Sequence, residues 1–139
     1  MAPLQILLID DDADDREIFA WVIQNLEPSL VIESAVDGVE ALDKLRDDQY
    51  RPDLIFLDLN MPKMHGLDCL KEIREIDRLS GCPVIVYSTS SNPQDVNKSR
   101  MAGASDYIVK GNEISVIKHE LSQALRKYFV NPTSPILFS

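Results

Sequence analysis

Five short apolar runs, separated by amphipathic stretches with helical spacing, constrain the fold of this chain more than any other feature. The runs are residues 4–9, 30–34, 54–57, 84–88 and 107–109. Three of them are apolar nearly throughout, which is typical of strands in a parallel sheet that is covered on both faces. The strict alternation of strand and helix predicts an α/β fold, a doubly wound, five-stranded parallel sheet with five helices on its two sides.

Local signals mark several of the helix ends. Asn92 followed by Pro93 predicts an N-cap with proline at the first helical position. Gly103 predicts the end of that helix, because glycine readily takes the left-handed conformation that closes a helix. Asn112 is the expected cap of the last helix. The apolar face of that helix consists of Ile114, Ile117, Leu121, Leu125 and Tyr128.

The length and composition fit one domain. With 139 residues the chain can bury one sizeable core, and 45% hydrophobic and 27% charged residues are ordinary for a globular protein. We expect a domain over residues 1–130, followed by a C-terminal tail at 131–139 and no effector domain. The tail is read as a frayed terminus, while Ile136, Leu137 and Phe138 leave open a docking arm for a partner.

The charge and the chain ends limit the expected partners. A formal net charge of -9 is repelled by nucleic-acid phosphates, so direct DNA binding is not expected. No apolar stretch approaches the length of a membrane span, and the N-terminus lacks the basic and apolar regions of a signal peptide. Cys69 and Cys82 have no CxxC spacing and fit free thiols. We therefore expect a cytoplasmic protein.

Polar side chains stand where four of the five apolar runs end. Asp10 and Asp11 follow the first run, and Asp58 follows the third. Ser88 closes the fourth run, and Lys110 follows the fifth. Because ligands of parallel α/β sheets bind beside the carboxyl ends of the strands, we expect these side chains to meet in one cleft.

This combination of side chains suits the reversible phosphorylation of one aspartate. Crowded carboxylates repel one another, and Mg²⁺ relieves that repulsion because it prefers carboxylate, carbonyl and water oxygens. A carboxylate on the same metal can attack phosphorus and form an aspartyl phosphate. The Lys110 ammonium and the Ser88 hydroxyl can each hold a phosphate oxygen. Asp12, Asp14 and Asp15, by contrast, are expected to be solvated or to cap the first helix.

With these motifs the chain resembles the receiver domains of response regulators, the CheY-like family. The matching motifs are Asp10-Asp11, residues 56–62 with Gly66 following, Ser88-Thr89 and residues 102–110. The resemblance covers nearly the whole chain and implies a flavodoxin-like sheet with strand order 2-1-3-4-5. The run of residues 86–91 and the expected lack of an effector domain are similar to the small single-domain regulators that are paired with bacterial phytochromes and hybrid histidine kinases.

The resemblance implies a phosphoacceptor and a metal site. Asp58 would accept the phosphoryl group. Asp11 and Asp58 would bind Mg²⁺ through their carboxylates, and Asn60 would bind it through its backbone carbonyl. Asp10 would act on the metal mainly through water.

The resemblance also implies a switch. Ser88 would be the hydroxyl that moves toward the phosphate, Tyr107 the aromatic that turns inward when Ser88 moves, and Lys110 the phosphate ligand. The implied function is a stand-alone two-component response regulator that takes phosphoryl from a histidine kinase or a phosphotransfer protein. Such a protein is no enzyme beyond its own phosphorylation and dephosphorylation. Relatives of this kind dimerise through the face of the fourth helix, fifth strand and fifth helix, or with a C-terminal arm.

Three other functions stay open. A phosphorelay intermediate would use the same chemistry. A small phosphohydrolase would also form an aspartyl phosphate, but Asp14 stands in the last place of its DxDx[TV] element and Asn60 stands where a second acid is required. A receiver-like scaffold that is never phosphorylated is disfavoured, because every required residue is present.

Two residues depart from the family pattern. Gly111 follows Lys110 where the family usually has proline, often with a cis bond, so a trans bond is expected. Thr89 stands where many members have alanine or glycine. Its larger side chain is expected to shield the acyl phosphate from water and to lengthen the life of the phosphorylated state.

Overall fold

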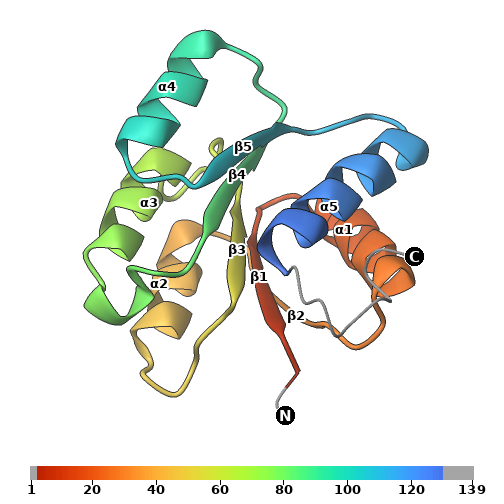
Figure 1. The fold of residues 1–139 in the computed structure, drawn as a ribbon. Helices are drawn as coiled ribbons and strands as arrows, with labels where there is room; N and C mark the ends of the chain where they lie inside the picture. The colour runs from red at the N-terminus through yellow and green to blue at the C-terminus, as the bar shows by residue number, and fades with distance from the viewer. Residues whose placement is uncertain (1–2, 130–139) are drawn as a thin grey trace.

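The computed structural model describes residues 3–129 and shows one parallel sheet between two layers of helices (Figure 1). The strand order is β2-β1-β3-β4-β5. The strands are β1 (Gln5–Ile9), β2 (Val31–Ala35), β3 (Leu54–Leu57), β4 (Val84–Ser88) and β5 (Asp106–Val109). The helices are α1 (Ala13–Leu26), α2 (Gly38–Arg46), α3 (Gly66–Arg74), η1 (Asp77–Leu79, a 3₁₀ turn), α4 (Pro93–Met101) and α5 (Ile114–Tyr128). The expected fold class and strand order are confirmed, and the expected tail at 131–139 lies outside the described residues.

The central strands are apolar because each face of the sheet has its own helix layer. On one face, Leu7 and Ile55 pack with side chains of α2 and α3. On the other face, where α1 and α5 lie, Phe19 and Phe56 meet edge to face with ring centroids 4.9 Å apart, and Leu121 belongs to the same cluster. Each fully buried side chain of this size contributes about 1.5–3 kcal/mol. This two-sided burial confirms the interpretation of the continuous apolar runs.

The two edge strands are less buried than the central strands, and three of the five predicted ranges differ from the observed strands by one residue. Val31 and Val109 are 39% and 38% exposed. The predicted range 30–34 is shifted by one residue from β2, and the predicted ranges 4–9 and 107–109 each miss the start of the observed strand, β1 or β5, by one residue. The central ranges 54–57 and 84–88 are confirmed without change.

The helix ends confirm two predictions and correct a third. The Asn92 side chain caps α4, and Gly103, with a φ of 108°, lies just beyond its end. The expectation that Asn112 caps α5 is wrong. Glu113 is the N-cap residue, without a side-chain hydrogen bond, because its carbonyl accepts the first helical bond from the N–H of Ile117 at 3.0 Å.

Backbone hydrogen bonds beyond the strand ends fix the edge where the polar residues lie. The N–H of Asp58 donates to the carbonyl of Ile9 at 2.9 Å. The N–H of Lys110 donates to the carbonyl of Ser88 at 2.7 Å. The ladders of neighbouring strands therefore hold these residues at one edge of the sheet before any side chain is considered.

The length and hydropathy of the helices test whether any of them could span a membrane. Within residues 3–129, no helix combines the length and the apolar character needed to cross a bilayer.

Candidate phosphorylation site

Three carboxylates meet beside the ends of β1 and β3. Their ligand oxygens, from Asp10, Asp11 and Asp58, all lie within 4.8 Å of one another. Asp10 is fully buried and Asp58 is 7% exposed, whereas Asp11 is open to solvent. The donors are all oxygens, and the open side admits water. The cluster therefore fits a small, hard divalent cation.

Burial changes the acidity of two of these carboxyl groups. Removal from water raises the pKa of Asp58 to about 6, while nearby Lys110 lowers it and Asp10 raises it. Burial also raises the pKa of Asp10, against the lowering effect of its hydrogen bond with Lys110. Both shifts show that the anionic forms are poorly stabilised here. A bound cation would relieve this, because it favours the ionised carboxylates.

Lys110 reaches the cluster from the end of β5. Its Nζ donates to Oδ2 of Asp10 at 2.7 Å and to Oδ2 of Asp15 at 2.8 Å, and lies 3.8 Å from Oδ2 of Asp58. The lysine side chain is 7% exposed. Burial alone would lower the pKa of Lys110, but the hydrogen bonds to Asp10 and Asp15 raise it above its ordinary value. The ammonium therefore stays charged beside the carboxylates.

The contact of Asp15 with Lys110 was not expected. The sequence predicted Asp12, Asp14 and Asp15 to be solvated or to cap the first helix. Asp12 is indeed the N-cap of α1, since its side chain accepts from the N–H of Asp15 at 2.9 Å. Asp15 instead turns to the lysine. Only its position in the first turn of the helix that follows β1 could have predicted from the sequence that Asp15 lies near the site.

Ser90 links the two predicted switch residues. The N–H of Ser90 donates to the buried Ser88 hydroxyl at 3.2 Å, and its carbonyl accepts from the Tyr107 hydroxyl at 2.7 Å. The sequence had assigned no role to Ser90. A movement of Ser88 would therefore change the hydrogen bonding of Tyr107 through a single residue, Ser90, of the β4–α4 loop.

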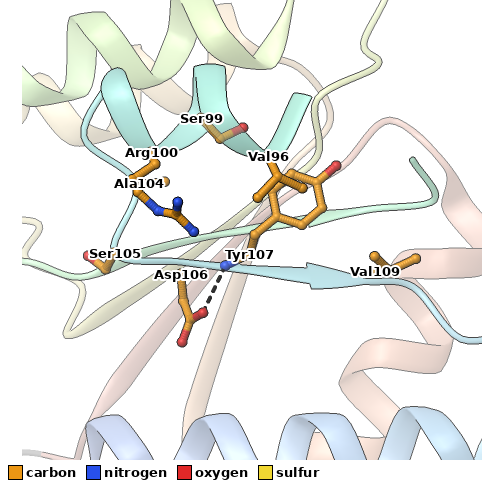
Figure 2. Close-up of a pocket in the computed structure, with 8 residues that line it drawn as sticks. All are labelled: Val96, Ser99, Arg100, Ala104, Ser105, Asp106, Tyr107 and Val109. Carbon is orange, nitrogen blue, oxygen red and sulfur yellow. Dashed lines mark hydrogen bonds between the residues drawn. The ribbon is translucent and has the colours of Figure 1, made fainter. Parts of the chain in front are cut away.

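The Tyr107 side chain lies between β5 and α4. Figure 2 shows it directed toward α4, on the side of Val96 and Ser99. These residues line a hollow of about 410 Å³ together with Val109 and others of β5. The N–H of Tyr107 also donates to the carboxylate of Asp106 at 3.0 Å. The half-buried ring thus stands at the surface where α4 and β5 meet.

The remaining predicted features lie near the cluster. The N–H of Asn60 approaches Oδ1 of Asp58 at 3.4 Å, and the metal role of the Asn60 carbonyl stays a prediction. No cis peptide bond occurs among the described residues, so the trans bond expected between Lys110 and Gly111 is confirmed. His65 is exposed, and its ring nitrogen caps α3 by accepting from the N–H of Leu67.

A family comparison decides the class of this protein. The model of the response regulator receiver domain matches residues 6–122. The chain belongs to this family. The receiver domain is a component of two-component signalling, and receiver domains bind Mg²⁺ in an acidic pocket, with which the cluster of Asp10, Asp11 and Asp58 is consistent. The resemblance in the sequence is thereby confirmed.

The receiver domain is similar to known proteins over most of its length. The chemotaxis protein CheY1 of Helicobacter pylori is 34% identical over 122 residues, which is 88% of this chain and 97% of that protein. The structure of the phosphorylated cyanobacterial phytochrome response regulator RcpA superposes with a TM-score of 0.86 at 31% identity, covering 92% and 95% of the two chains. The Mn²⁺-bound response regulator Rcp1 gives 0.81 at 28% identity, covering 93% and 96%.

Some curated relatives are much longer than this receiver domain. A protein-glutamate methylesterase/protein-glutamine glutaminase 1 of Methanospirillum hungatei is 33% identical over 115 residues. The match covers 83% of this chain but 33% of that protein. The shared region is the receiver domain, so the likeness does not bear on the activity of the longer protein.

Proposed function

We propose that this chain is a stand-alone two-component response regulator that accepts phosphoryl on Asp58 from a histidine kinase or a phosphotransfer protein. The observation that carries this proposal is the meeting of Asp58 with two further carboxylates and Lys110 at one sheet edge. The proposed location is the cytoplasm.

Mg²⁺ is the proposed cofactor. Asp11 and Asp58 would hold it through carboxylates, Asn60 through its backbone carbonyl, and Asp10 mainly through water. The residues fit, because three oxygen donors crowd within 4.8 Å and one buried ammonium accompanies them. When bound, Mg²⁺ neutralises charge that develops on a transferring phosphoryl group. The likeness to Rcp1, known in a Mn²⁺-bound form, supports a divalent cation here.

The proposed chemistry is the transfer of a phosphoryl group from a histidine nitrogen of the donor to a carboxylate oxygen of Asp58. A carboxylate oxygen of Asp58 forms a bond to phosphorus while the phosphorus–nitrogen bond of a phosphohistidine breaks, and the imidazole leaves with the electron pair. Lys110, 3.8 Å from Asp58, would hold one phosphoryl oxygen, and the Ser88 hydroxyl would hold another. The protein would catalyse its own phosphorylation and dephosphorylation and no other reaction.

The output of the proposed switch is a change of interaction surface. Phosphorylation would bias an equilibrium between two arrangements of the β4–α4 loop. The hydrogen bonds of Ser90 to Ser88 and Tyr107 support this route, because they join the site to the face of α4, β5 and α5. That face, or the tail, is the proposed homodimer contact. The likeness to RcpA supports a place among regulators paired with phytochromes or hybrid kinases.

Metal removal tests the proposal directly. With Mg²⁺ and acetyl phosphate, intact-mass measurement is expected to show one phosphoryl adduct, because the cation offsets the repulsion between the donor and the crowded carboxylates. With a chelator the adduct is expected to disappear, while the circular dichroism spectrum stays that of a folded protein. A folded, Mg²⁺-bound protein that gains no adduct from acetyl phosphate or a histidine kinase would sink the proposal. Turnover of phosphate esters would instead favour the phosphohydrolase.

Thr89→Ala is expected to shorten the life of the phosphorylated state. Thr89 is exposed next to Ser88 and lines a hollow with Lys110, so we expect its side chain to cover the site against water. Loss of this cover should make hydrolysis several-fold faster, followed by intact mass after the donor is removed. Ser91→Ala, at an exposed position two residues later, is the control and should match wild type. Equal decay of the Thr89→Ala and wild-type adducts would contradict the shielding role.

A further inference from the structure

A carboxylate outside the proposed metal set shares the lysine of the site. Oδ2 of Asp15 accepts from Nζ of Lys110 at 2.8 Å, whereas Oδ2 of Asp58 lies 3.8 Å from the same atom. The second distance is too long for a hydrogen bond. In this structure Lys110 is therefore bonded to Asp10 and Asp15, and Asp58 is left without a direct bond to it.

Hydrogen bonds fix the backbone at both members of the pair. Asp15 lies in the first turn of α1, whose N-cap Asp12 accepts from the N–H of Asp15 at 2.9 Å. Lys110 follows β5, where its N–H donates to the carbonyl of Ser88 at 2.7 Å. Both partners thus start from fixed backbone positions, and their contact requires little further ordering.

The two carboxylate partners of Lys110 differ in their access to water. The Asp10 side chain is 1% exposed, whereas the Asp15 side chain is 38% exposed. A hollow of about 300 Å³ is lined by Asp15, Thr89 and Lys110, among others. If the ammonium moved away, Asp10 would remain as a buried anion, but water could solvate Asp15. The contact with Asp15 is therefore the one that can open at little cost.

We propose that Asp15 is a positioning residue that competes with the phosphoryl group on Asp58 for the ammonium of Lys110. In the unphosphorylated protein Asp15 draws the lysine toward α1. After phosphorylation the lysine shifts toward the phosphoryl oxygens, and Asp15 is released to solvent. The inference rests on the proposed phosphorylation of Asp58, and it makes Asp15 a determinant of how strongly the phosphorylated state is favoured.

The test uses beryllofluoride with Mg²⁺ as a stable mimic of a phosphoryl group on a carboxylate. Calorimetric titration of Asp15→Asn is expected to show about 5-fold tighter binding than wild type, because the mimic no longer competes with Asp15 for the lysine. Asp14→Asn is the matched control. It removes the same charge from an exposed position in the same helical turn, and its affinity should stay close to that of wild type.

Two further measurements separate competition from a general charge effect. In a Lys110→Met background, Asp15→Asn should no longer tighten binding, since the proposed effect acts through the lysine. The ¹⁵N and ¹H signals of the Lys110 ammonium should shift in Asp15→Asn before the mimic is added, and should not shift in Asp14→Asn.

The outcomes decide between the two proposals. Weaker or unchanged mimic binding in Asp15→Asn, or an equal gain in Asp14→Asn, would overturn the competition. If wild type binds no mimic while the Lys110 signal still reports its pair with Asp15, the proposed function fails and the competition falls with it. Unchanged Lys110 signals in Asp15→Asn would show that the pair is not formed in solution.

Discussion

Asp58→Asn is expected to abolish the Mg²⁺-dependent phosphoryl adduct completely. The amide keeps the size of the side chain but supplies neither the anionic nucleophile nor a charged metal ligand. Asp58 is the buried member of the cluster that follows β3, and its neighbours Asp10 and Asp11 are assigned to the metal. Intact mass with acetyl phosphate, followed by peptide mapping, measures the result.

The control for this variant is Asp43→Asn. Asp43 is exposed on α2, so the substitution changes the net charge equally but lies outside the site. It should gain the adduct as wild type does. An adduct that persists in Asp58→Asn and maps to Asp11, the exposed member of the cluster, would show that the wrong aspartate was assigned.

In the metal-free protein, the free energy of unfolding is expected to fall as the pH rises from about 4 to above 6. The folded environment raises the pKa of Asp58 from an ordinary 3.8 to about 6. Below 3.8 the group is protonated in both states, and between the two values only the unfolded state has lost the proton. Ionisation then favours unfolding, and above about 6 the loss reaches about 3 kcal/mol. Burial of Asp10 acts in the same direction.

Urea unfolding at several pH values, with a chelator present, measures this dependence. Asp58→Asn should unfold less readily than wild type above pH 6, and the difference should vanish near pH 4. Asp43→Asn should keep the wild-type profile. Saturating Mg²⁺ should recover stability at high pH, because a ligand that binds the folded state stabilises it. A profile for Asp58→Asn that parallels wild type at every pH would contradict the raised pKa.

The fold was largely readable from the sequence because burial leaves a pattern. β1, β3 and β4 are covered on both faces, and their apolar runs gave the observed bounds of β3 and β4 and came within one residue of those of β1. Asn92 and Gly103 marked the ends of α4, since a cap depends on a few neighbouring residues. The prediction that Asn112 caps α5 was wrong because it too rested on the neighbouring residues alone. The sequence offered a good capping residue, but the backbone of α5 begins its hydrogen bonds at the carbonyl of Glu113.

The candidate site was predicted as a set of residue types at strand ends. Parallel strands bring their carboxyl ends to one edge, so Asp10, Asp11 and Asp58 had to approach one another once the sheet was parallel. No sequence pattern predicted the hydrogen bonds by which Ser90 connects Ser88 with Tyr107. It depends on the path of the β4–α4 loop and on the direction of the Tyr107 side chain, which no local pattern specifies.

The sequence by itself determined the alternation of strands and helices and the placing of acidic, hydroxyl and ammonium groups at one edge of the sheet. Only the tertiary structure decided which of these groups touch. Asp15 and Asp14 are neighbours of the same charge in one helical turn, yet Asp15 lies 2.8 Å from Lys110, a residue 95 positions away. The composition and periodicity of the sequence predict which residues are buried, but not which side chains touch. A single ion pair depends on side-chain directions that are set when α1 and β5 pack against the rest of the sheet.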